Sequence, residues 1–168
     1  MDNHVHFVAI PGDNDSLART FNVAHMRYAQ RLHRKMGSSG HLWQGRFFSC
    51  ALDDHHLLAA TRYVERNPAR AHSVRNPWDW KWSSADHHIG KSRSQMPLAG
   101  LFELIGMNSE KWKKYIENED ASFVNEIRKN TQTGRPFGAD TFIENLESRL
   151  SRKLTALPVG RPKIGRCP

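Results

Sequence analysis

The chain has 168 residues, enough for one ordinary domain with a small appendage. A formal net charge of +8 and a pI near 9.9 favour a polyanionic partner, nucleic acid above all, although a basic surface that serves solubility would give the same values. No apolar run reaches the roughly 20 residues of a transmembrane helix and no signal peptide is recognisable, so we expect a cytoplasmic protein without a membrane partner.

The first predicted element is a strand. Residues 4–10 form a short, apolar and β-branched run, which is typical of a buried strand. A helix follows, because apolar residues then recur at helical spacing. Asp15 or Ser16 would cap its start and Gly37 would end it.

A second strand and a second helix come next. Aromatic and polar residues alternate over residues 42–52, which predicts a strand. Asp53 would cap the helix that follows. We expect this helix to stop near Asn67, because Pro68 disfavours a helical conformation in the residue before it.

The remaining chain is predicted to be irregular over residues 71–96 and helical afterwards. Two or three short helices are expected, at 97–106, 109–117 and 121–130, and an amphipathic helix at 139–152. The chain ends in a basic segment, because residues 147–168 contain several Lys and Arg and a single Glu. This segment alone supplies much of the excess positive charge.

His4 and His6 form the first candidate site. Side chains at i and i+2 of a strand face the same way, roughly 7 Å apart by the strand rise, so the two imidazoles can converge on one metal ion. A His-x-His pair is a weak signal by itself. Two half-exposed histidines at the end of a strand are the simpler interpretation.

Tyr63 and Asn67 form the second candidate pair. They are four residues apart on the second predicted helix and therefore share a face. If that helix packs across the strand, Asn67 can offer its carbonyl oxygen as a third ligand, and Tyr63 can point its hydroxyl toward what the metal holds. Core packing is the alternative role for a helical tyrosine.

Three stretches, DNHVHF, GHLWQGRFFSC and TRYVERNPARA, resemble in that order the REP-associated tyrosine transposases, a branch of the HUH single-tyrosine transposases. The later segments WSSADHHIG and GRPFGADTFIENLESRL are similar to the C-terminal part of that family. The resemblance implies an α+β fold: a ferredoxin-like HUH nuclease core, N-terminally incomplete, at residues 1–90. A helical region at 91–154 and a basic disordered tail at 155–168 would follow.

The resemblance also implies a chemistry. Tyr63 would be the catalytic nucleophile, and His4, His6 and Asn67 would bind Mg²⁺ or Mn²⁺, which polarises the scissile phosphate. Attack by the tyrosine would leave a 5′-phosphotyrosine link and a free 3′-hydroxyl that can rejoin strands. The implied function is a DNA transposase or endonuclease that acts on single-stranded DNA near REP-type hairpins. Imidazole suits manganese better than magnesium, so the identity of the ion stays open.

Basic side chains are expected to hold DNA phosphates: Arg46, Arg62, Arg66, Arg70, Arg161 and Lys163. A solvated basic face is the alternative for those near the tyrosine. Trp43 and Phe47 could stack on unpaired bases, but core packing explains them more simply. His87 and His88 are neighbours that diverge on a helix or strand, so we expect both at the surface.

The chain also departs from the family. Family members carry a strand-helix-strand unit before the His-x-His strand, whereas Met1 here stands three residues before His4. We therefore expect that the strands at 4–10 and 42–52 lack a direct partner, which would leave exposed edges. A non-catalytic DNA-binding remnant is the alternative to an active enzyme, and the oligomeric state is open.

Overall fold

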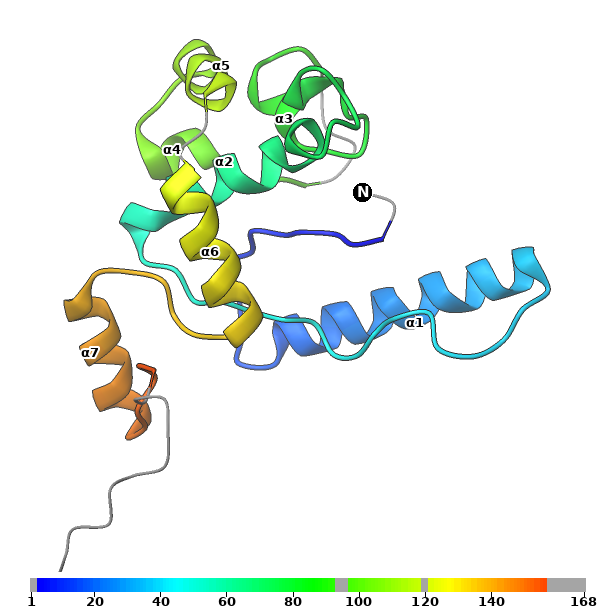
Figure 1. Ribbon diagram of the computed structural model, residues 1–168, viewed down its shortest axis with the longest axis horizontal. Helices are drawn as coiled ribbons and strands as arrows, with labels where there is room; N and C mark the ends of the chain where they lie inside the picture. The colour runs from blue at the N-terminus through cyan, green and yellow to red at the C-terminus, as the bar shows by residue number, and fades with distance from the viewer. Residues whose placement is uncertain (1–2, 93–96, 119–120, 157–168) are drawn as a thin grey trace, which may run out of the picture.

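The computed structural model describes residues 3–92, 97–118 and 121–156, and it is mainly helical (Figure 1). Helices make up 56% of these residues. In chain order they are α1 (Ser16–Met36), α2 (Asp54–Arg70), the 3-10 helix η1 (Pro77–Asp79), α3 (Ala85–His88), α4 (Leu101–Ile105), α5 (Ser109–Glu117), α6 (Ala121–Thr133) and α7 (Asp140–Leu150). Among the described helices, none combines the length and the apolar character that a membrane span requires.

The expected α+β fold with a ferredoxin-like core is wrong. In place of the strands expected at 4–10 and 42–52, the structure has extended or irregular segments that form no sheet within the described residues. At the end of the second segment, Leu52 forms an isolated parallel β-bridge with Phe137. A strand persists only when a neighbour satisfies its backbone groups. No backbone hydrogen bond joins residues 4–10 to the rest of the described chain, and Phe7 is exposed to solvent.

Helix α1 confirms the helix expected after the first segment. It begins at Ser16 and ends at Gly37, whose left-handed backbone (φ 61°) lets its N–H bond to the carbonyl of His33. None of its residues is buried, and it extends away from the other helices (Figure 1). The chain then runs back along α1, where Trp43 Nε1 donates to the carbonyl oxygen of His25 (3.1 Å).

Helix α2 starts as expected but ends later. The side chain of Asp53 caps it by accepting a hydrogen bond from the backbone N–H of His56 (2.8 Å). The expected end near Asn67 is wrong, because the helix continues through Pro68 to Arg70. Proline removes one backbone hydrogen bond, but Pro68 is buried in the last turn of the helix, so packing outweighs the local preference.

A buried carboxylate joins α2 to the segments that cover it. Glu65 is 0% exposed and accepts three hydrogen bonds. The donors are Ser84 Oγ (2.6 Å), His88 Nδ1 (2.5 Å) and Trp112 Nε1 (2.9 Å). The expected surface position of His88 is therefore wrong: its ring is buried because Glu65 gives it a hydrogen-bond partner.

Two apolar clusters surround α2. The first packs α2 against α6 and the segment before α7, and its buried members are Ala60, Tyr63, Val124, Ile127 and Phe137. The second joins α3, α4 and α5, with Leu58 of α2 packed against it; its buried members are Ala85, Leu101, Trp112 and Ile116. Helix α2 thus packs against η1, α5 and α6, and Glu65 joins it to α3.

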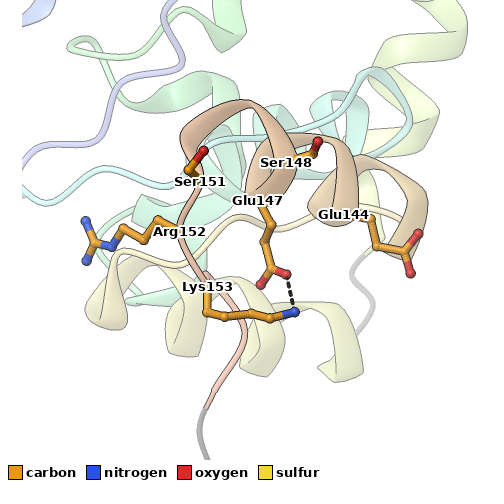
Figure 2. A pocket seen from close by; sticks show the side chains of 6 residues that line it. All are labelled: Glu144, Glu147, Ser148, Ser151, Arg152 and Lys153. Atoms are coloured by element: carbon orange, nitrogen blue, oxygen red, sulfur yellow. Dashed lines mark hydrogen bonds and ion pairs between the residues drawn. The ribbon is translucent and has the colours of Figure 1, made fainter.

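The helices expected in the C-terminal half are present. Helix α5 has the expected bounds, α4 is shorter than expected and α6 is longer, while α7 lies within the expected range. Glu147 of α7 fixes the chain that follows the helix (Figure 2). Its carboxylate accepts hydrogen bonds from Lys153 Nζ (2.9 Å) and from the backbone N–H groups of Leu154 (2.7 Å) and Thr155 (3.0 Å). These hydrogen bonds lower the pKa of Glu147 to about 2, and the bond from Lys153 has the largest effect.

Removal of the Glu65 carboxylate should destabilise the protein. Glu65→Ala leaves three donors without their acceptor, two of them buried (His88 and Trp112), so the free energy of unfolding should fall by roughly 3–5 kcal/mol. Urea unfolding followed by circular dichroism measures the change. Glu126→Gln, at an exposed position of α6, is the control and should change it by less than about 0.5 kcal/mol. Equal stability of the two variants would contradict a central role for Glu65.

Candidate functional site

The first extended segment brings two histidines to Tyr63 of α2. The ring centroids of His4 and His6 are 4.9 Å apart, and those of His6 and Tyr63 are 5.6 Å apart, both in edge-on contact. Residues i and i+2 of an extended chain face the same way, so this arrangement needs no sheet. The structure therefore brings together the two histidines and the tyrosine that the sequence singled out.

Asn67 lies one helical turn after Tyr63 and reaches the same place. Its Nδ2 is 3.1 Å from Nε2 of His4, and its Oδ1 accepts a hydrogen bond from Arg70 Nη1 (3.2 Å). A guanidinium only donates, so the amide atom next to Arg70 is the oxygen and the amide nitrogen faces His4. His4 Nε2 must then be the acceptor, and its Nδ1 can donate to Asn3 Oδ1 (2.6 Å).

Both imidazoles are held in the neutral form. Burial, followed by the neighbouring His4 and Arg70, lowers the pKa of His6 to about 4. Burial also lowers the pKa of His4 below its usual value. A neutral ring keeps a nitrogen lone pair, which is the form that binds a metal ion. At neutral pH the two rings can therefore serve as nitrogen ligands.

Tyr63 lies between this histidine pair and the protein interior. Its side chain is 8% exposed and packs in the cluster with Val124, Ile127 and Phe137. The Tyr63 ring therefore packs in the core, which is the role that the sequence offered as the alternative to a nucleophile. Its contact with His6 shows that one side of the ring lies toward the histidine pair.

Arg70 holds Tyr63 and Asn67 together. Its guanidinium carbon lies 4.4 Å from the centre of the Tyr63 ring, and its Nη2 donates to the Tyr63 carbonyl oxygen (3.2 Å). The same guanidinium binds Oδ1 of Asn67. Arg70 was expected to hold a phosphate. The contacts of Arg70 with Asn67 and Tyr63 were not predicted from the sequence. The spacing could have indicated them, because Arg70 follows Asn67 by three residues and Tyr63 by seven, which places all three on one helix face.

The other expected DNA contacts lie elsewhere. Arg62 stacks on the ring of Tyr115 (4.2 Å to the centroid), and Arg66 Nη1 donates to the carbonyl oxygen of Ile116, so both arginines are engaged by α5. Arg46 is exposed on the segment after α1. Arg161 and Lys163 lie outside the described residues.

The donor set fits a divalent ion with one condition. Within the described part of the chain, no three His, Cys, Asp or Glu side chains gather as a potential metal site. The set is therefore two neutral imidazoles and the amide of Asn67, a combination that suits transition metals such as manganese. The condition is that the Asn67 oxygen, now bound by Arg70, turns toward the histidines.

Comparison with known proteins supports a transposase. Residues 1–67, which include the histidine pair, Tyr63 and Asn67, match the family described as "Transposase IS200 like". This match supports a role in DNA transposition and recombination, with DNA as the partner. No curated protein and no solved structure matches the chain.

In metal-free protein the His6 ring should titrate near pH 4, against about 6.5 in the urea-unfolded chain. Between these values the unfolded chain binds a proton that the folded chain does not. The contribution of His6 to stability is therefore complete above pH 6.5 and is lost as the pH falls toward 4. Ring ¹⁵N shifts measured by NMR give both pKa values, with His6→Ala to assign the signal. A folded-state pKa of 6.5 or higher would refute the burial of this ring.

Proposed function

We propose that this protein is a metal-dependent DNA transposase that cleaves and rejoins single-stranded DNA with Tyr63 as a covalent nucleophile. The observation that carries the proposal is the convergence of four side chains inside the transposase match: His4, His6, Tyr63 and Asn67. Core packing alone explains the burial of Tyr63. It does not explain why two neutral histidines, one of them in contact with the Tyr63 ring, lie together beside the amide of Asn67.

His4, His6 and Asn67 would hold Mg²⁺ or Mn²⁺. The ion would withdraw electron density from the scissile phosphate. Because the ligands are uncharged, they would not reduce the positive charge with which the ion acts as a Lewis acid. Neutral histidines suit this task, because burial keeps their lone pairs free of protons at neutral pH. Among the described side-chain contacts, a single hydrogen bond, from Asn67 to His4, joins this pair to α2.

Tyr63 supplies the nucleophile. A bond forms between Tyr63 Oη and phosphorus while the bond from phosphorus to the 3′ oxygen breaks. The phenol gives up its proton and the departing 3′ oxygen takes one up, which leaves a 5′-phosphotyrosine and a free 3′-hydroxyl. The reverse attack by a 3′-hydroxyl rejoins the strands and restores the phenol.

Arg70 changes partners in this scheme. When the Asn67 oxygen turns to the metal, the Arg70 guanidinium loses an acceptor and can donate to a phosphate oxygen close to Tyr63. Arg46, Arg62, Arg66, Arg161 and Lys163 are further proposed contacts to the DNA backbone. The contacts of Arg62 and Arg66 with α5 make these two the weakest members of that set.

The proposed substrate is single-stranded DNA beside a REP-type hairpin. His6 contacts the Tyr63 ring, and the tyrosine is only 8% exposed, so the phenol would be reached by a flexible strand more easily than by a stiff duplex. The hairpin is included in the proposed substrate because the sequence resembles the REP-associated branch of the family.

A non-catalytic DNA-binding protein is the second candidate. The 8% exposure of Tyr63 and the bond from Arg70 to the Asn67 oxygen favour it, since both withdraw groups that the chemistry needs. The two candidates differ in one product, the covalent protein–DNA adduct.

Tyr63→Phe should abolish the adduct while it leaves folding and DNA binding intact, because only a hydroxyl is removed. The measurement uses a labelled hairpin with a single-stranded 5′ flank, Mn²⁺ and denaturing gel electrophoresis. Tyr28→Phe, which changes an exposed tyrosine of α1, is the control and should form as much adduct as the wild type. An adduct with the Tyr63→Phe protein would refute the assignment. No adduct with the wild type would favour the non-catalytic candidate.

The double variant His4→Ala/His6→Ala should bind Mn²⁺ about 100-fold more weakly or not at all, because both nitrogen ligands are lost. Isothermal titration calorimetry should find one site in the wild type. Asn67→Ala should weaken binding less. The control His41→Ala/His55→Ala removes two exposed histidines and should bind Mn²⁺ as the wild type does. Equal affinity of the two double variants would exclude a metal site at the histidine pair.

A further inference from the structure

One continuous stretch of the chain is basic and contains no acidic residue. Between Ser16 and Leu52 there are six Lys or Arg residues and no Asp or Glu. Five of the six lie on α1, which none of the other described helices covers (Figure 1). The charge of this region is therefore concentrated on a helix that is open to solvent.

Four of these side chains form a stripe on α1, which we call the basic stripe: Arg27, Arg31, Arg34 and Lys35. At 3.6 residues per turn they fall within an arc of about 100°. All four are exposed. Arg19 stands apart, because it pairs with Asp15 (3.5 Å).

The basic stripe has no acidic partner among the described residues, where no ion pair involves any of its members. Like charges three or four residues apart destabilise a helix by a few tenths of a kcal/mol each. Cations in the last turn interact favourably with the helix dipole, which accounts for Arg34 and Lys35. The dipole does not account for Arg27 and Arg31, which lie further from the helix end.

An adjacent face of α1 is covered by aromatic side chains from the returning segment. Trp43 stacks on His25 at 4.1 Å between ring centroids, and Phe47 contacts Phe21 at 5.0 Å. These rings pack on one another and are partly buried. They leave the basic stripe open, and they are not free to stack on unpaired bases, which is the usual basis of single-strand binding.

We propose that the basic stripe of α1 is a docking surface for duplex DNA, separate from the site at Tyr63. It binds phosphates, because all four of its members are cations, and contacts with phosphate oxygens position a duplex without reading its sequence. From Arg27 to Lys35 the helix rises about 12 Å, which is close to the width of the major groove. This inference rests on the proposed function in one respect: it takes DNA to be the polyanion that binds the stripe.

The test is the salt dependence of DNA binding by the full chain without metal, so that cleavage plays no part. The probes are a blunt DNA duplex, a DNA single strand of equal length and an RNA duplex. Each lost phosphate contact flattens the log–log slope by about 0.9. The variant Arg27→Gln/Arg31→Gln/Arg34→Gln/Lys35→Gln should flatten the slope for duplex DNA by about three to four. Glutamine keeps the helix propensity, and circular dichroism checks the fold.

The matched control removes four exposed charges elsewhere: Arg75→Gln/Lys111→Gln/Lys114→Gln/Lys129→Gln. It should change the slope by less than about one. The variant Arg27→Lys/Arg31→Lys/Arg34→Lys keeps point charges and should retain the wild-type slope. Equal flattening in both quadruple variants would overturn the proposal. So would a slope loss as large on the single strand as on the duplex, or tighter binding of the RNA duplex than of the DNA duplex.

The two proposals fail separately. A flattened slope in the stripe variant together with no covalent adduct in the wild type would support the docking surface and refute the nuclease chemistry. An adduct that depends on Tyr63 together with an unchanged slope would do the reverse.

Discussion

The buried carboxylate of Glu65 is the interaction on which the rest of the structure depends. A charged group without solvent is tolerated only when its acceptors are filled, and here Ser84, His88 and Trp112 fill them. These donors come from two segments distant in sequence, so the carboxylate fixes where α3 and α5 meet α2. Glu65 lies two residues after Tyr63 and two before Asn67, which places it on the opposite face of the helix. The face that carries the candidate site is therefore supported from behind by a polar core.

Arg70 has a corresponding role on the front face. It contacts both Tyr63 and Asn67, and it keeps the amide oxygen turned away from the histidines. In the proposed function, a metal ion would compete with the Arg70 guanidinium for this oxygen. A metal that displaced Arg70 from Asn67 would leave the guanidinium with one acceptor fewer beside the Tyr63 ring, where the proposed function places a phosphate. This coupling follows from the hydrogen-bonding capacity of the three side chains and requires no rearrangement of α2.

The positive charge of the chain is divided between two places with different physical properties. Near Tyr63 the arginines are partly buried and engaged by aromatic rings or carbonyl groups, so they act at short range and in defined directions. The cations of the basic stripe on α1 are exposed and have no acidic partner among the described residues, so they act at longer range and are screened by salt. The first arrangement suits the positioning of a reacting strand. The second suits the capture of a polyanion before it is positioned.

Local interactions made much of this structure predictable from sequence, and non-local ones decided the remainder. The start of α2 at Asp53, the end of α1 at Gly37 and the bounds of α5 follow from capping and periodicity, which act within a few residues. The convergence of His4 with His6 and of Tyr63 with Asn67 follows from i+2 and i+4 spacing. The expected sheet is wrong for a non-local reason, because residues 4–10 and 42–52 become strands only if another segment pairs with them along their length. Among the described residues this pairing is limited to the isolated bridge between Leu52 and Phe137. The burial of His88, the passage of α2 through Pro68 and the contacts of Arg62 and Arg66 with α5 were likewise decided by the tertiary structure. In each case the energy comes from a partner far away in sequence, and the residue itself does not specify what lies opposite it.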